Sequence, residues 1–179
     1  MAELLSLEMV EKHYITDQLV LDVIYDIDNL TDENYSKYYN GEITIDRYGR
    51  KVPKPAHGTY RLENKTSSSK LISEGFVNLY NNIVNHRLLI RKINICAGNL
   101  SNEYEYKEEK KNQFEQINLF TDYKQNKKEE EKEVKEHQIQ ETIINIKRKY
   151  GKNAILKGID LEEGATTIDR NKQIGGHSE

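Results

Sequence analysis

The clearest strand signal in the chain is Leu19-Val-Leu-Asp-Val-Ile-Tyr-Asp-Ile27. Every second side chain from Leu19 to Ile27 is apolar, and the side chains between them are mixed, which is the period of a strand. A strand with one apolar face and one mixed face lies in a sheet that is covered on one side and partly wet on the other. We therefore expect neighbouring strands and a helical cover for one face.

The segments around this strand give the order α-β-β-α-β. Residues 2–14 repeat apolar side chains at helical spacing, and a second helix follows the capping residues Ser67–Ser69. His57–Leu62 and Leu88–Ala97 are further strands. The pattern predicts an α+β fold: a small antiparallel or mixed sheet with two helices on one face.

The remaining segments are more polar. The connection 28–56 is long and rich in tyrosine, and Glu42–Asp46 within it is a candidate for a short edge strand. We assign residues 1–100 to the folded domain. Residues 101–137 lack apolar periodicity, which predicts a flexible charged linker, and residues 138–179 form a helix followed by an irregular tail.

Composition excludes several classes of protein. Hydrophobic residues make up 36% of the 179 and charged residues 32%, so the folded core is modest for this length. No apolar run approaches the roughly 18 residues that span a membrane, and the first residues lack the bases of a signal peptide. The lone Cys96 excludes a disulfide framework. We predict a buried free thiol and a location in the cytoplasm.

The net charge of −3 argues against a general nucleic-acid binder. The basic residues, however, are concentrated in stretches of the sequence that contain no acid. No acid occurs within residues 47–62 or 75–102. The candidate DNA-binding residues are Arg47, Arg50, Lys51, Lys54, Arg91 and Lys92. The first four lie in a proline-containing loop, where a solvated loop is an equally good interpretation. Arg91 and Lys92 are adjacent in a strand, so we expect only one of them on the open sheet face.

A short apolar motif interrupts the charged linker. Its candidate binding residues are Gln116, Asn118, Leu119 and Phe120. The pattern Gln-x-x-Leu-Phe is close to the peptide with which bacterial proteins dock on the sliding DNA clamp, where Leu and Phe fill an apolar pocket. The alternative is a minor contact that docks the linker on its own domain.

No group of residues indicates catalysis. Asp26 and Asp28 have the spacing of a metal-binding pair, but a strand end that enters a polar turn explains them better. The five histidines have no partner at ligand spacing. We therefore predict no catalytic residue, no metal site and no cofactor in this chain.

The motifs, taken in order, resemble one family. The stretches that carry the resemblance are Leu19–Leu30, Tyr48–Thr59, Thr66–Ile72, Leu89–Ile95, Gln116–Phe120, Gly151–Gly158, Gly164–Asn171 and Ile174–His177. They resemble the C-terminal part of a Y-family translesion DNA polymerase of the UmuC-like kind found in Gram-positive bacteria.

The resemblance implies that residues 1–100 are similar to the little-finger domain, a sheet with two helices on one face that contacts the phosphates of duplex DNA. It implies phosphate contacts from Arg91 and Lys92 and, by the match to this subgroup, from the bases of the Arg47–Lys54 loop. The palm domain, which binds catalytic magnesium in this family, would lie before Met1, and the first strand of the little finger is also missing.

The resemblance therefore implies a monomeric module of DNA damage bypass in the SOS response, without polymerase activity of its own. Its expected partners are duplex primer-template DNA and the bacterial sliding clamp. The alternative is a regulatory module that binds the clamp or a repair partner without binding DNA, which the near-neutral charge of residues 1–100 favours.

Overall fold

The computed structural model of this chain describes residues 1–112 and 123–172. It divides into two compact units, Met1–Asn118 and Leu119–Glu179. All strands of the described residues lie in the first unit, and the described part of the second consists of a long helix and a folded tail.

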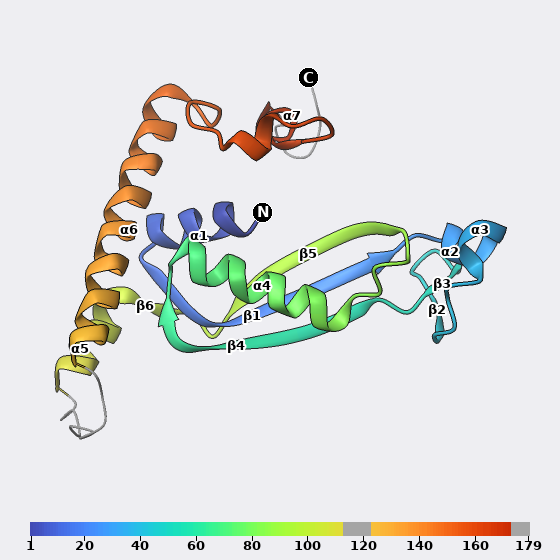
Figure 1. Cartoon of the computed structure of the whole chain (residues 1–179), viewed down its shortest axis with the longest axis horizontal. Helices are drawn as coiled ribbons and strands as arrows, with labels where there is room; N and C mark the ends of the chain where they lie inside the picture. The colour runs from blue at the N-terminus through green and yellow to red at the C-terminus, as the bar shows by residue number, and fades with distance from the viewer. Residues whose placement is uncertain (113–122, 173–179) are drawn as a thin grey trace. The chain divides into compact units, whose positions relative to one another are not determined.

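The main sheet is built around β1 (Tyr14–Tyr25). Strand β4 (Ala56–Thr66) pairs with one side of β1, and β5 (Ile90–Gly98) pairs with the other. The short strand β6 (Ser101–Asn102) continues β5 in the same register along the first residues of β1. All of these pairs are antiparallel (Figure 1).

Two helices cover one face of this sheet, as the sequence predicts. Helices α1 (Ala2–Glu11) and α4 (Ser69–Ile83) pack against each other and against β1. The predicted apolar face is buried from Leu19 to Tyr25, and Leu19, Leu21 and Val23 are at most 2% exposed; Ile27 lies beyond the strand and is half-buried. The buried side chains form one core with Met9 of α1 and with α4, through Ile72, Phe76 and Leu79. The α+β fold is confirmed.

The serines before α4 cap this helix and connect it to α1. The Ser68 side chain accepts a hydrogen bond from the Leu71 amide at 3.2 Å and caps the helix. The Ser6 hydroxyl of α1 donates to the Ser67 carbonyl at 2.6 Å, which links the two helices. Capping and helix contact therefore account for these serines.

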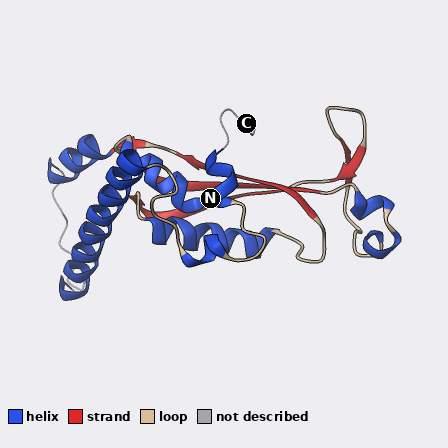
Figure 2. Ribbon diagram, turned by 90° about the horizontal axis from the view of Figure 1, so that it is seen from above, coloured by secondary structure: helices blue, strands red, loops and turns tan. Residues whose placement is uncertain are grey.

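The long connection after β1 has regular structure of its own. It contains two single-turn helices, α2 (Asp28–Thr31) and α3 (Glu33–Ser36), and a hairpin of β2 (Ile43–Ile45) and β3 (Lys51–Pro53). The candidate edge strand at 42–46 is thus a strand, but it pairs only with β3 and not with the main sheet. The hairpin projects beyond the end of the main sheet (Figures 1 and 2).

The helices differ from the sequence prediction in two places. The first helix ends at Glu11, because the positive φ of His13 turns the chain directly into β1. The region predicted as a linker contains α5 (Glu103–Asn112) and the first half of α6 (Tyr123–Tyr150). Glu and Lys favour helices without an apolar stripe, and ion pairs one turn apart, such as Lys107–Glu103 at 2.6 Å, add to this.

The tail after α6, which the sequence analysis predicts to be irregular, contains two short regular elements. It contains a 3-10 turn, η1 (Gly158–Leu161), and the short helix α7 (Thr167–Lys172). The Asp160 carboxylate accepts hydrogen bonds from the Lys157 amide at 3.0 Å and from the Thr167 hydroxyl at 2.8 Å. These bonds, led by that from Lys157, lower the pKa of Asp160 and tie the turn to α7.

Gly75 allows α4 to approach the sheet closely, and we expect Gly75→Ala to destabilise the fold. An added Cβ would lie 2.6 Å from Leu19 Cδ1, and Leu19 is fully buried and has no room to move. We expect a loss of about 1–3 kcal/mol in the free energy of unfolding, measured by urea denaturation, because overpacking outweighs the gain of about 1 kcal/mol in helix propensity.

Asn78→Ala is the matched control, since Asn78 is exposed on the same helix. It should leave stability unchanged or raise it slightly. Equal stability of the Gly75→Ala protein would show that the helix and the sheet are not packed as closely as described.

Candidate nucleic-acid interface

A β-bulge places Arg91 and Lys92 together. Tyr25 pairs with Ile90 and Ile24 pairs with Lys92, so Arg91 is one extra residue in β5. A bulge interrupts the alternation of a strand. Both bases are exposed, whereas Ile90 and Ile93 on either side of them pack against the core. The register puts Lys92 opposite Ile24 on the side of the sheet away from the helices, and the bulge leaves Arg91 exposed beside it.

Asn29 positions the chain that leads into this bulge. Its side chain is fully buried and donates hydrogen bonds to the carbonyls of Asp26, at 2.9 Å, and Leu89, at 2.8 Å. It also accepts a hydrogen bond from the Leu89 amide at 2.8 Å. Asn29 therefore holds the segment before β5 against the turn after β1. Asp26 and Asp28 form part of the turn after β1, since the Asp26 carboxylate accepts a hydrogen bond from the Asp28 amide.

The open face, which is the side of the sheet away from α1 and α4, is mixed in character. The register places Asp22 between His57 and Asn94, and the His57 and Asp22 side chains meet at 2.5 Å. Gln18 lies opposite Arg61, a base that the sequence analysis did not single out. The alternation from His57 to Leu62 is the signal that places Arg61 on this face.

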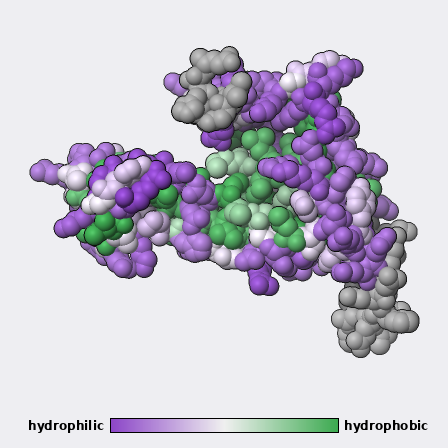
Figure 3. All heavy atoms as spheres, turned by 180° about the vertical axis from the view of Figure 1, so that it is seen from behind, coloured by the Kyte–Doolittle hydropathy of each residue, from purple (hydrophilic) through white to green (hydrophobic). Residues whose placement is uncertain are grey.

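Cys96 also lies on the open face, opposite Val20. It is exposed, so the predicted buried thiol is wrong. The bulge again supplies the reason, because it shifts the alternation of every later residue of β5. Figure 3 shows that apolar side chains gather in the middle of the view opposite to that of Figure 1.

The hairpin neutralises part of its own charge. Arg50 donates to the Asp46 carboxylate through two guanidinium nitrogens, at 2.9 and 2.7 Å. Lys54 pairs with Glu42 at 2.7 Å. Arg47 and Arg50 both lie against the Tyr48 ring, at 4.7 and 5.3 Å from its centroid. Glu42 and Asp46 lie just before the acid-free stretch 47–62 in the sequence. In the folded hairpin they form ion pairs with two of the bases of that stretch, Lys54 and Arg50.

The two predicted sets of bases lie at the same end of the sheet. Strand β3 carries Lys51 and leads into β4, whose first residue, Ala56, pairs with Val23. The next residue of β1, Ile24, faces Lys92. The hairpin and the β5 bulge are therefore neighbours in the fold, although about forty residues separate them in the sequence.

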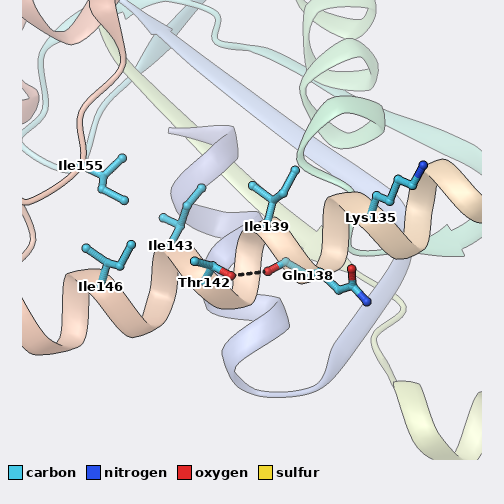
Figure 4. Close-up of a pocket in the computed structure, with 7 residues that line it drawn as sticks. All are labelled: Lys135, Gln138, Ile139, Thr142, Ile143, Ile146 and Ile155. Atoms are coloured by element: carbon cyan, nitrogen blue, oxygen red, sulfur yellow. Dashed lines mark hydrogen bonds between the residues drawn. The ribbon is translucent and has the colours of Figure 1, made fainter.

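The predicted clamp-binding residues Gln116, Asn118, Leu119 and Phe120 lie outside the described residues. The second unit has an apolar groove of its own, of about 370 Å³. Figure 4 shows Ile139, Ile143 and Ile146 of α6 on its floor and Ile155 of the tail opposite them. The Thr142 hydroxyl at its edge donates to the Gln138 carbonyl at 2.8 Å. Its lining is suited to apolar contact rather than to acid–base chemistry.

The described ranges, 1–112 and 123–172, contain no group of three or more His, Cys, Asp or Glu side chains that could hold a metal ion. They also contain no helix with the length and apolar character that crossing a membrane requires. Comparison of the sequence with known proteins finds no matching family model and no matching curated protein.

The hairpin should loosen in acid. Asp46 accepts hydrogen bonds from the amides of Arg50 and Tyr48, and that from Arg50 does most to lower its pKa below 3.8. A lowered pKa means that the carboxylate stabilises the folded hairpin above the unfolded pKa, and that this contribution is lost as the pH falls through the folded pKa. We expect the exchange protection of the Tyr48 and Arg50 amides, measured by NMR, to fall below about pH 4.

Asp46→Ala should remove this protection at every pH, whereas Glu63→Ala, which removes an exposed carboxylate from β4, should leave it intact. Unchanged protection in Asp46→Ala would mean that the carboxylate does not organise the hairpin.

Proposed function

We propose that this chain is a DNA-binding and clamp-docking module similar to the C-terminal part of a UmuC-like Y-family translesion polymerase. The observation that carries the DNA-binding part is the β5 bulge. It exposes Arg91 and Lys92 side by side at the end of the sheet where the basic hairpin projects. Two adjacent cations on a rigid strand suit contacts with consecutive phosphates.

The rest of the fold is consistent with this proposal. Within the described part of the first unit, both helices lie on one face of the antiparallel sheet, and the other face could lie along a duplex. The open face adds Arg61, and the hairpin adds Arg47 and Lys51. Backbone contacts of this kind carry no sequence information, which suits a protein that acts on any template.

The clamp part of the proposal rests on the sequence motif. Leu119 and Phe120 are the two side chains that would enter the apolar pocket of the clamp, with Gln116 and Asn118 at its rim. The module would act in the cytoplasm during DNA damage bypass. It would have no polymerase activity of its own, and catalytic magnesium would be held by a palm domain outside this chain.

A second candidate function is a clamp-binding or repair-partner module without a DNA role. The neutralisation of Arg50 by Asp46 and of Lys54 by Glu42 favours it, because paired bases have less to offer a phosphate. The salt dependence of DNA binding separates the two functions.

The DNA-binding function predicts weak, salt-sensitive association with a primer-template duplex. Four to six phosphate contacts give a log–log slope against salt of about −4 to −5. Arg91→Glu/Lys92→Glu should reduce the magnitude of this slope by about 2, measured by fluorescence anisotropy from low to moderate salt.

Lys12→Glu/Lys70→Glu is the matched control, because it changes the net charge equally at the C-cap of α1 and in the first turn of α4. Its slope should equal that of the unaltered chain. An equal loss in both double variants would assign binding to overall charge, and a flat salt dependence would favour the second candidate function.

The clamp-docking function predicts binding of the chain to a bacterial sliding clamp with a dissociation constant in the micromolar range, since a single peptide buries few side chains. Leu119→Ala/Phe120→Ala should abolish this binding, measured by surface plasmon resonance. Ile159→Ala/Leu161→Ala, which truncates two exposed apolar side chains of η1, should leave it unchanged. Binding that survives in the first variant would show that the motif is not the docking peptide.

A further inference from the structure

Tyr48, at the tip of the hairpin of β2 and β3, is an aromatic ring held in solvent beside positive charge. It is 66% exposed, so burial does not account for its position. The guanidinium carbons of Arg47 and Arg50 lie 4.7 and 5.3 Å from its ring centroid. The turn that carries it is closed by hydrogen bonds, since Asp46 accepts from the Tyr48 amide at 2.8 Å and from the Gly49 amide at 3.0 Å. The ring is therefore displayed at a fixed place rather than packed into the fold.

Tyr38 repeats this arrangement in the segment after α3. It is 40% exposed, with Lys37 Nζ at 5.0 Å and the guanidinium carbon of Arg87 at 6.0 Å from its ring centroid. The neighbouring Tyr39 hydroxyl accepts a hydrogen bond from the Lys54 amide at 2.8 Å, which ties this segment to the hairpin. Arg87 lies in the connection that leads into β5, at the same end of the sheet (Figure 1). Both tyrosines therefore belong to the end of the first unit that carries the candidate interface.

An exposed ring with cations beside it matches the two parts of a nucleotide. A base of any sequence can stack on an aromatic face, and a cation next to the ring can meet the phosphate. Among the described residues, Lys37, Arg47 and Arg87 form no ion pair with an acid, so their charge is available. Within a duplex the faces of the bases are covered by their neighbours, so unpaired nucleotides are the ones that can use these rings.

We propose that this end of the first unit binds single-stranded DNA, with one base stacked on Tyr48 and another on Tyr38. The phosphates of the same strand would lie at Arg47 and Arg87. The proposal rests on the DNA-binding part of the proposed function and adds a second form of the substrate to it. Arg91 and Lys92 contact the paired region, and the two tyrosines take unpaired nucleotides that leave it.

The probe is a fluorescein-labelled oligothymidylate of about twelve nucleotides, titrated with the full chain at low salt and followed by fluorescence anisotropy. Tyr48→Leu and Tyr38→Leu should each weaken binding about tenfold, because each removes one base–aromatic stack. Neither should change the slope of log affinity against log salt, because neither removes a charge. Tyr48→Phe and Tyr38→Phe keep the ring and should bind as the unaltered chain does.

Tyr150→Leu is the matched control, because Tyr150 is 67% exposed on α6 and has Lys149 Nζ at 5.0 Å from its ring centroid. It should leave oligothymidylate binding unchanged. An equal loss of affinity in Tyr150→Leu would overturn the inference, as would a loss in the phenylalanine variants that matches the loss in the leucine variants.

A blunt duplex titrated in parallel separates the inference from the proposed function. The leucine variants of Tyr48 and Tyr38 should bind it as tightly as the unaltered chain does. Duplex binding together with equal oligothymidylate affinity in these variants and the unaltered chain would overturn the inference alone. Tyrosine-dependent oligothymidylate binding without duplex binding would support the inference and overturn the duplex contacts of the proposed function. Binding of neither DNA would overturn both.

Discussion

Hydrogen bonding to β1 sets the position of every other strand in the main sheet. β4, β5 and β6 all pair with it, and none of them pairs with another strand of that sheet. Because side chains alternate along a strand, one register decides which residues of β4 and β5 join Leu19, Leu21 and Val23 in the core. The same register decides which side chains lie on the open face of the sheet.

The single interruption of this regularity in β5 lies at its basic residues. Ile90 and Ile93 are three apart and would point to opposite sides of a regular strand, yet both reach the core. The bulge at Arg91 resolves this conflict, and the buried amide of Asn29 holds Leu89 just before it. Packing of two half-buried isoleucines against the core therefore determines where the bulge exposes Arg91 and Lys92, which links core packing to the candidate interface.

Short-range electrostatics shape the two most polar parts of the molecule. Asp46 organises the hairpin turn by accepting from two amides and from Arg50, and Asp160 joins η1 to α7 in a similar manner. Neither segment has enough apolar side chains to form a core. Carboxylates that accept hydrogen bonds from backbone amides instead hold these segments in place. In the hairpin, carboxylates also neutralise bases and so reduce the positive charge available to an anionic partner.

The periodicity of apolar residues in the sequence was sufficient to predict the central strand of the sheet and a helix that covers it. The alternation of Leu19–Tyr25 and the helical stripe through Ile72, Phe76 and Leu79 predict the strand, the helix and the buried faces, because both patterns arise from local backbone geometry. The candidate bases could be named for the same reason. Local pattern does not contain the pairing between distant segments, which produces the bulge at Arg91, the exposure of Cys96 and the hydrogen bonds between Asn29 and Leu89. These follow from which strand lies beside which, and only the tertiary structure decides that.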